Sequence, residues 1–272
     1  MMLVKMVLGK LTAVWRCVYI AAVCFLLTAT STASEKSTLA SNASRLAPLL
    51  WRVSLPGADK ASSAVYVFGS VHFGHSRFYP LPSYINDAFS SVEELVVEVD
   101  VTRIQAKSSS ELIAALGYLP RGKRLSDYLS EQELADLRAI CESVGIDYDQ
   151  LLTAKPWFAA IQLSAVQLSR SDYEHALGID RHFLGRASGM VVSELESLQE
   201  QLAMFDDISQ EDQLSFLRET IAKFDGGEAY LEKISRAWMA GGETELTRLL
   251  VDEFAGQDSA RRIHQRVIVD RN

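Results

Sequence analysis

The sequence predicts a mixed α/β (α+β) fold, in which a small central sheet carries a large helical insertion. Short apolar and β-branched runs, which are typical of strands, occupy residues 51–55, 64–68, 95–99 and 190–192. Between and after these runs, apolar residues recur at helical spacing over most of the chain. Few strands and many helices indicate one sizeable domain, which we place at residues 49–272.

The first two runs predict a β-hairpin. Apolar and polar residues alternate at residues 51–55, which is the pattern of a half-buried strand. Turn-forming residues follow at 56–59, and the second strand, at residues 64–68, ends at Gly69. The third run, at residues 95–99, is continuous and β-branched, so it predicts a buried strand.

Capping signals mark the helices. Ser130 and Glu133 form a capping-box pattern and Gly145 is typical of a helix end, which predicts a helix between them. Cys141 lies on the apolar stripe of that helix, so we expect it in the core rather than as a reactive thiol. Pro156 predicts the start of another helix. Apolar spacing predicts three more, at residues 214–224, 231–238 and 246–254.

The N-terminus has the order of a secretory signal peptide. Basic residues precede an apolar run at 17–27, and small residues follow it. Residues 31–33 fit the small-x-small cleavage rule, so we predict a signal peptide at 1–33 and a flexible spacer at 34–48. The apolar run is shorter than the roughly 20 residues of a membrane-spanning helix. We therefore expect no stable membrane span after cleavage; an uncleaved N-terminal anchor is the alternative.

Charge and cysteine content restrict the functional class. The net charge of −8 argues against a nucleic-acid binder, which would carry a basic face. Cys17 and Cys24 lie in the predicted signal peptide, so Cys141 would be the one cysteine left after cleavage. An intramolecular disulfide and a cysteine-based zinc site are then excluded. We expect an exported protein of the periplasm.

The most distinctive local pattern is Gly-Ser-Val-His-Phe-Gly at residues 69–74, directly after an apolar strand. Catalytic groups often lie where a strand passes into a loop. Histidine can bind a metal or transfer protons near neutral pH, so His72 is a candidate catalytic residue and metal ligand. An ordinary loop histidine is the alternative, and we expect His75, His175 and His264 to be loop or surface residues.

Glu98 is the second candidate, because it lies inside the apolar run 95–99. A buried carboxylate is costly unless it is paired or metal-bound. Glu98 is therefore either the partner of an arginine or a functional group, namely a general base or a metal ligand.

Two further candidates could contact a substrate. His182 and Asp180 stand at the start of a predicted helix, where a capping role for Asp180 is as plausible as a catalytic one. Glu194 and Glu196 project to the same side of a strand-like stretch, so one of them could point into a cleft. We take His182 and Glu196 as the candidate substrate-binding residues.

Nine short segments, in a specific order and spacing, resemble the TraB/GumN family. The family includes the Tiki proteases and is related to ChaN-like and erythromycin-esterase-like proteins. The resemblance extends from residue 50 to residue 272. Its segments are residues 50–53, 67–74, 81–82, 95–100, 155–157, 178–184, 194–197, 201–202 and 270–272.

The resemblance implies a metal-dependent hydrolase with two Gly-x-x-His motifs, a strand glutamate and an arginine before the second motif. It makes His72 the first motif histidine, Glu98 the glutamate and Arg271 the arginine, with a divalent metal on His72 and Glu98. The second motif would follow Arg271, but the chain ends at Asn272. We therefore expect a domain without its C-terminal strand and with weak or no activity.

The functional prediction is an exported metal-dependent hydrolase with an unknown substrate, for which the resemblance makes a peptide the candidate. The alternative is a non-catalytic periplasmic protein or pseudoenzyme that binds haem, iron or a protein partner.

Overall fold

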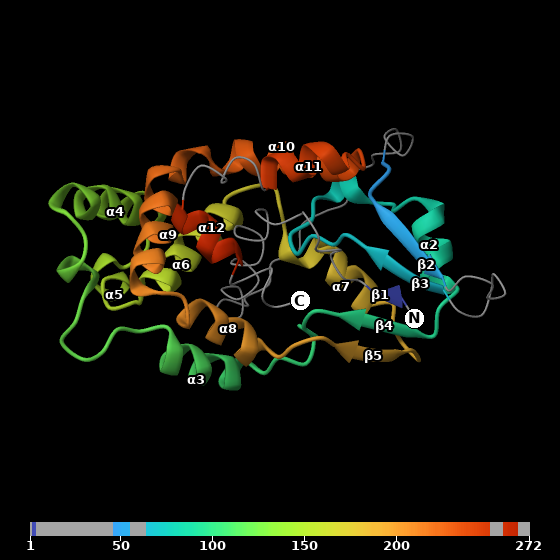
Figure 1. The fold of residues 1–272 in the computed structure, drawn as a ribbon, viewed down its shortest axis with the longest axis horizontal. Coiled ribbons are helices and arrows are strands. Elements are labelled where there is room, and N and C mark those ends of the chain that lie inside the picture. Colours follow the sequence, from blue (N-terminus) through green and yellow to red (C-terminus); the bar gives the residue numbers. More distant parts are fainter. Residues whose placement is uncertain (1, 4–45, 55–63, 251–257, 266–272) are drawn as a thin grey trace.

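The molecule is elongated, with a five-stranded sheet at one end and a group of helices at the other (Figure 1). The structure is a computed structural model, and it describes residues 2–3, 46–54, 64–250 and 258–265. Helices α10 and α11 run along one side of the molecule, and α3 and α8 lie on the opposite side (Figure 1). This mixed α/β architecture confirms the predicted fold class.

The sheet has the strand order β2-β3-β1-β4-β5. Its strands are β1 (Met2–Leu3), β2 (Leu50–Ser54), β3 (Ala64–Phe68), β4 (Glu94–Val97) and β5 (Val191–Glu194). Strands β2 and β3 are antiparallel, which confirms the predicted hairpin, and the other pairs are parallel. Loops that leave the carboxyl ends of β3 and β4 therefore meet at one edge of the sheet.

Strand β1 fills the centre of the sheet. Met2 pairs with Tyr66 of β3 on one side and with Leu95 of β4 on the other. These residues belong to the predicted signal peptide, so a chain cleaved after Ala33 would not contain this strand. The remaining residues of that segment lie outside the described residues, and the signal peptide stays a prediction.

The helices account for most of the described chain. The α-helices are α2 (Ser83–Ser90), α3 (Ala106–Leu116), α4 (Glu131–Val144), α5 (Tyr148–Leu151), α6 (Pro156–Ser169), α7 (Ile179–Leu184), α8 (Leu198–Asp206), α9 (Gln210–Ala222), α10 (Gly227–Met239), α11 (Glu243–Leu250) and α12 (Asp258–His264). Short 3-10 turns are η3 (Ser76–Phe78), η4 (Leu125–Asp127), η5 (His175–Leu177) and η6 (Phe224–Gly226).

Helix α4 forms as its caps predict. The Ser130 hydroxyl accepts the Glu133 N–H, and the Glu133 carboxylate accepts the Ser130 N–H. Gly145 ends the helix with a left-handed φ of 76°. Cys141 is fully buried, and burial raises the pKa of its thiol to about 11, so it is an unreactive core residue as predicted.

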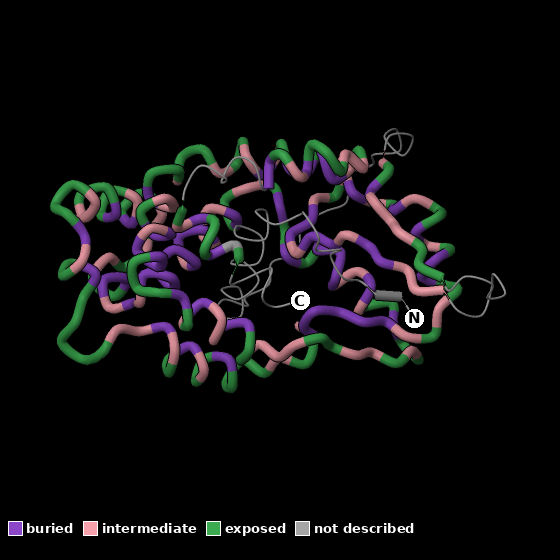
Figure 2. The backbone as a smooth tube through the Cα atoms, viewed as in Figure 1, coloured by how far each residue is buried: buried purple, intermediate pink, exposed green. Residues whose placement is uncertain are grey.

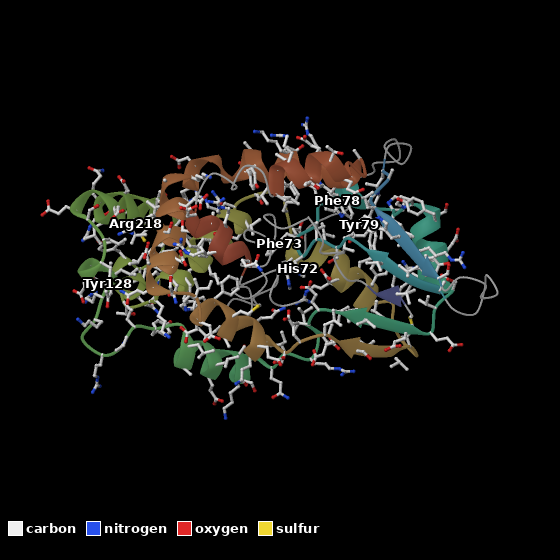
Figure 3. All side chains as sticks on the ribbon, in the orientation of Figure 1. His72, Phe73, Phe78, Tyr79, Tyr128 and Arg218 are labelled. Carbon is white, nitrogen blue, oxygen red and sulfur yellow. The ribbon has the colours of Figure 1, made fainter. Side chains whose placement is uncertain are left out.

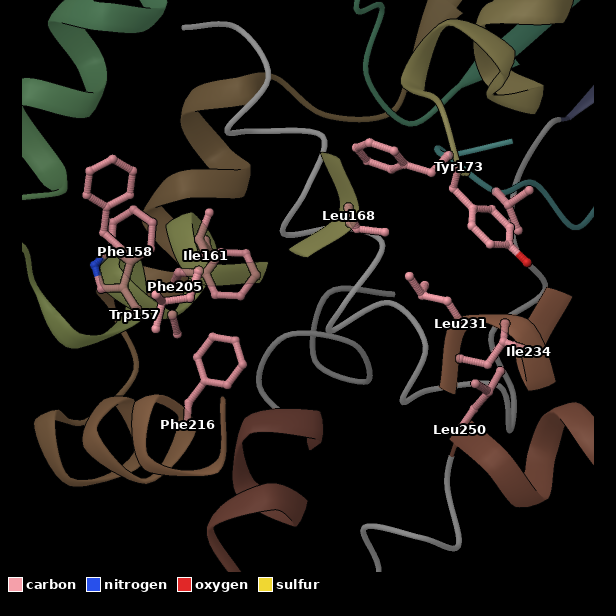
Figure 4. Close-up of a cluster of buried hydrophobic side chains, with 14 of the residues drawn as sticks. Trp157, Phe158, Ile161, Leu168, Tyr173, Phe205, Phe216, Leu231, Ile234 and Leu250 are labelled. Carbon is pink, nitrogen blue, oxygen red and sulfur yellow. The ribbon is translucent and has the colours of Figure 1, made fainter. Parts of the chain in front are cut away.

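Helix α6 is the centre of the helical half. It begins at Pro156, as predicted, and it is buried on nearly all sides (Figure 2). Trp157 stacks on Phe205 of α8, with ring centroids 5.9 Å apart (Figure 4). The Trp157 indole N–H and the Lys155 ammonium both donate to Asp206, so the end of α8 is fixed to the start of α6.

Some predicted boundaries differ from the structure. The third strand ends at Val97, so Glu98 follows the strand instead of lying inside it. The fourth strand begins at Val191, one residue later than predicted, and continues to Glu194. The helix predicted at 231–238 begins earlier, at Gly227, because the chain turns at η6 and immediately resumes helical geometry.

The end of the predicted spacer contacts the helices. The Ala47 N–H donates to the Met239 carbonyl at 2.7 Å, and the Tyr84 hydroxyl donates to the Pro48 carbonyl at 2.5 Å. The earlier part of the spacer, the turn at 56–59 and Arg271 lie outside the described residues. No helix within the described ranges is long and apolar enough to cross a membrane.

Candidate active site

A loop that leaves β3 presents His72; we call residues 69–78 the histidine loop. Phe68, the last residue of β3, is fully buried against Phe183 of α7, with ring centroids 5.8 Å apart. The Trp238 indole N–H of α10 donates to the Gly69 carbonyl at 2.8 Å. The loop therefore starts from a fixed point, and its His72 lies near the middle of the molecule (Figure 3).

The histidine loop pairs with residues 174–180, just before and at the start of α7. Gly74 and Glu174 exchange two backbone hydrogen bonds, of 2.9 and 2.7 Å. The Ile179 N–H donates to the Val71 carbonyl at 2.8 Å. Backbone contacts on both sides of His72 thus fix its position relative to α7.

Two glycines allow this close approach. A Cβ on Gly74 would lie 1.8 Å from the Leu177 carbonyl oxygen. A Cβ on Gly178 would lie 2.2 Å from the His72 carbonyl oxygen. Both contacts are with backbone atoms, which cannot move aside as a flexible side chain can, so any residue larger than glycine would push the two segments apart.

The His72 ring contacts a buried carboxylate. Its Nδ1 lies 2.6 Å from Oδ2 of Asp180, and the two side chains are 12% and 6% exposed. Burial acts to raise the pKa of Asp180. The charge and hydrogen bond of His72, together with a hydrogen bond from Ser70, outweigh burial and lower that pKa overall. Asp180 is therefore a carboxylate at neutral pH, as a short charge-assisted hydrogen bond requires.

A second histidine lies beside this pair. His175 is 8% exposed, with its ring 5.5 Å from that of Phe73. Burial, followed by the charges of Arg181 and His72, lowers the pKa of His175 to about 4, against an opposing effect of Asp180. The ring is therefore neutral at pH 7. The prediction of a surface residue was wrong for His175, because residues far away in sequence, on the histidine loop, cover it.

Glu98 lies at the same edge of the sheet. It is 5% exposed and directly follows β4, and its carbonyl accepts the N–H groups of Leu195 and Glu196, both at 3.1 Å. Neighbouring strands are about 4.8 Å apart, so β3 and β4, with β1 between them, are separated by about 10 Å. His72 and Glu98 thus leave parallel strands from the same end of the sheet.

The sequence of this chain places it in a known family. The profile of the TraB/PrgY/gumN family matches residues 49–272. The chain belongs to the TraB/PrgY/gumN family. The resemblance predicted from the nine segments is thereby confirmed.

The chain is similar to proteins that are described as uncharacterized. The chain is 25% identical over 189 residues to the uncharacterized protein YbaP of Escherichia coli (strain K12), and equally to that of Shigella flexneri; the match covers 69% of this chain and 67% of YbaP. An uncharacterized protein of Treponema pallidum (strain Nichols) is 22% identical over 244 residues, 88% of this chain and 72% of that protein. No solved structure matches the chain.

The two candidate substrate-binding residues lie outside the His72–Asp180 contact. The His182 ring packs on Tyr79, with centroids 4.8 Å apart, and its Nε2 is 3.1 Å from Arg186. Two residues along a helix correspond to about 200°, so His182 points away from Asp180. Glu196 accepts a hydrogen bond of 2.7 Å from Gln201. The roles of His182 and Glu196 stay predictions.

The described part of this TraB-family chain does not fit a complete metal centre. Within it, no group of three or more His, Cys, Asp or Glu side chains could hold a metal ion. A catalytic zinc site normally takes three protein ligands, whereas the predicted pair is His72 and Glu98. The described residues therefore support no chemical step through a metal.

Proposed function

We propose that this chain is an exported hydrolase of the TraB/PrgY/gumN family in which His72 is the reacting side chain. One observation carries the proposal: a largely buried imidazole, at the carboxyl edge of parallel strands, contacts a buried carboxylate. Structural histidines of the core are commonly neutral, whereas a histidine bonded to an ionised carboxylate is set up to accept and return a proton.

The contacts indicate which ring atom reacts. Nδ1 of His72 is bonded to Asp180, so Nε2 is the atom that takes a proton from an attacking water and returns it to the leaving group. Glu98 is a second carboxylate at the same edge of the sheet. General acid–base catalysis of this kind contributes about 10²–10⁴-fold to a rate.

A peptide substrate and a periplasmic location remain parts of the proposal that come from the sequence. The divalent metal stays a prediction of the sequence: because Nδ1 of His72 is bonded to Asp180, a metal would compete with proton transfer for Nε2. Amino-terminal sequencing of protein from a periplasmic extract tests the location: a start near Ser34 supports cleavage. A chain that still begins at Met1 in the membrane fraction would favour the anchor.

The experiment for the activity compares two histidines of the same loop. The full chain, His72→Asn and His75→Asn are assayed on a panel of peptides and esters, and bound metal is measured by mass spectrometry. We expect His72→Asn to lower the rate by about 100-fold or more. His75→Asn serves as the control, because His75 accepts the Arg77 N–H as a helix cap and asparagine can do the same.

Two results would contradict the proposal. Equal rates for the full chain and His72→Asn would show that His72 does not take part in the reaction. No hydrolysis by the full chain, together with a Soret band after haem addition, would favour the periplasmic binding protein.

A further inference from the structure

We infer that Asp180 is the positioning residue of this site: its carboxylate holds the His72 ring in the orientation and tautomer that leave Nε2 as the proton acceptor. The inference rests on the proposed function in that it takes His72 as the reacting side chain. It assigns to Asp180 a role that the sequence left open between helix capping and chemistry.

The structure does not use Asp180 as a helix cap. The N-cap of α7 is Gly178, which has no side chain to cap the helix. Asp180 lies two residues further on, and its Oδ2 contacts Nδ1 of His72, 108 residues away in sequence. A carboxylate that served only the helix would point to its backbone N–H groups or to solvent.

The backbone around Asp180 leaves its carboxylate little freedom to move away from the ring. The Ile179 N–H is bonded to Val71, the residue before His72, and Gly178 lies against the His72 carbonyl. Asp180 itself is 5% exposed. The residues next to Asp180 are thus in contact with the segment that carries His72. The carboxylate and the imidazole therefore keep a fixed relative position, as catalysis requires.

The neighbouring polar groups support one tautomer. The Asp180 carboxylate accepts hydrogen bonds from His72, from Ser70 and from its own backbone N–H, and all three favour the ionised form. A carboxylate accepts hydrogen bonds and cannot donate them, so the proton between the two side chains lies on Nδ1. His175 is neutral and adds no competing positive charge.

Replacing the acid by its amide tests this assignment. In Asp180→Asn, the amide NH₂ can donate to Nδ1, which moves the ring proton to Nε2 and removes the acceptor for the reaction. We expect kcat to fall by about 100-fold or more with little change in KM, because binding does not use the ring proton.

A matched control is available on the other side of the molecule. Asp212 of α9 is also 5% exposed, and it forms a two-pronged pair with Arg262 of α12. Asp212→Asn therefore removes an equally buried charge. It should lower the thermal midpoint without changing the tautomer of His72 or kcat.

The measurement is the ¹⁵N spectrum of the histidine rings in the full-length chain, with His72 assigned by the loss of its signals in His72→Asn. We expect Nδ1 to be protonated in the wild-type protein, and the proton to move to Nε2 in Asp180→Asn. This readout needs no substrate, so it separates failure of the positioning role from failure of the proposed function.

Three outcomes would overturn the inference. The first is an unprotonated Nδ1 on His72 in the wild-type protein. This result would refute the inference even if Asp180→Asn does not fold. The second is an unchanged ring tautomer in a folded Asp180→Asn. The third is an equal change of the His72 signals in Asp212→Asn. If the tautomer results hold while the wild-type chain hydrolyses nothing, the hydrolase proposal fails and the positioning role stands.

Discussion

The histidine loop is held from two sides, and the two sides use different contacts. Toward α7, the loop meets residues 174–180 through backbone hydrogen bonds and two glycines, with no space for a Cβ. Toward α10, side chains form the contacts. Close backbone pairing permits only small residues at the contact. Side-chain contacts restrain the loop less tightly and tolerate amino-acid substitution.

The α10 side has its own regular pattern. Arg77 donates to both carboxylate oxygens of Glu232 and to the Ser235 hydroxyl, and Trp238 donates to Gly69. Glu232, Ser235 and Trp238 are three residues apart, so they share one face of the helix. If backbone pairing restrains the loop more tightly than side-chain contacts do, substitutions on the α7 side should lower stability and activity more than substitutions on the α10 side.

The largest effect is expected for Gly178→Ala. Its Cβ would lie 2.2 Å from the His72 carbonyl oxygen, and relief requires a shift of the histidine loop. We expect a loss of about 3 kcal/mol of stability, at the upper end of overpacking costs, or roughly 10 °C in the thermal midpoint. Activity should fall as well, because His72 moves relative to Asp180.

Gly69→Ala is the matched control in the same loop. A Cβ there would meet no atom within 4 Å, so stability should change by less than about 1 kcal/mol. Thermal unfolding of both variants decides the point: similar midpoints would show that the close approach at Gly178 does not limit the fold.

A smaller effect is expected for Glu232→Gln on the α10 side. Burial acts to raise the pKa of Glu232, but hydrogen bonds from Arg77, Arg236 and Tyr173 lower it to about 2. Because the folded-state pKa is depressed, the carboxylate stabilises the protein above its unfolded pKa of 4.5, and this stability is lost as the pH falls toward 2.

The variant should therefore be less stable than the wild type by about 1–2 kcal/mol at pH 7, and the difference should vanish as the pH approaches 2. Urea unfolding at a series of pH values measures this. Glu245→Gln, which removes an exposed partner of Arg248, should change the midpoint less. A pH-independent difference for Glu232→Gln would mean that its charge is not the cause.

The sequence predicted the regular elements better than the site. The hairpin, the caps of α4 and the start of α6 depend on neighbouring residues, so local patterns were sufficient. The position of Glu98 after the strand and the insertion of β1 between β3 and β4 depend on pairing between distant segments. Sequence periodicity does not predict which distant segments pair.

Within the site, the sequence singled out His72 and left the role of Asp180 open. It missed the burial of His175, because that burial arises where the histidine loop covers η5. The glycine at 178 was a possible signal. A glycine directly before a helix allows another backbone segment to approach closely. Here Gly178 allows the backbone at His72 to lie against the start of α7, the helix that carries Asp180.

The smallest effect is expected for Tyr79→Phe, which tests the α7 side itself. The Tyr79 hydroxyl donates to the Leu177 carbonyl at 2.8 Å and is a side-chain contact within a region held mainly by backbone pairing. Its loss should cost about 1 kcal/mol, the net value of one hydrogen bond. The ring tautomer of His72 should not change, because Gly74, Glu174 and Ile179 keep their backbone bonds. Thermal unfolding and the ¹⁵N spectrum measure both quantities. A loss as large as that of Gly178→Ala would mean that side chains hold the α7 side too, and the distinction between the two sides of the loop would then fail.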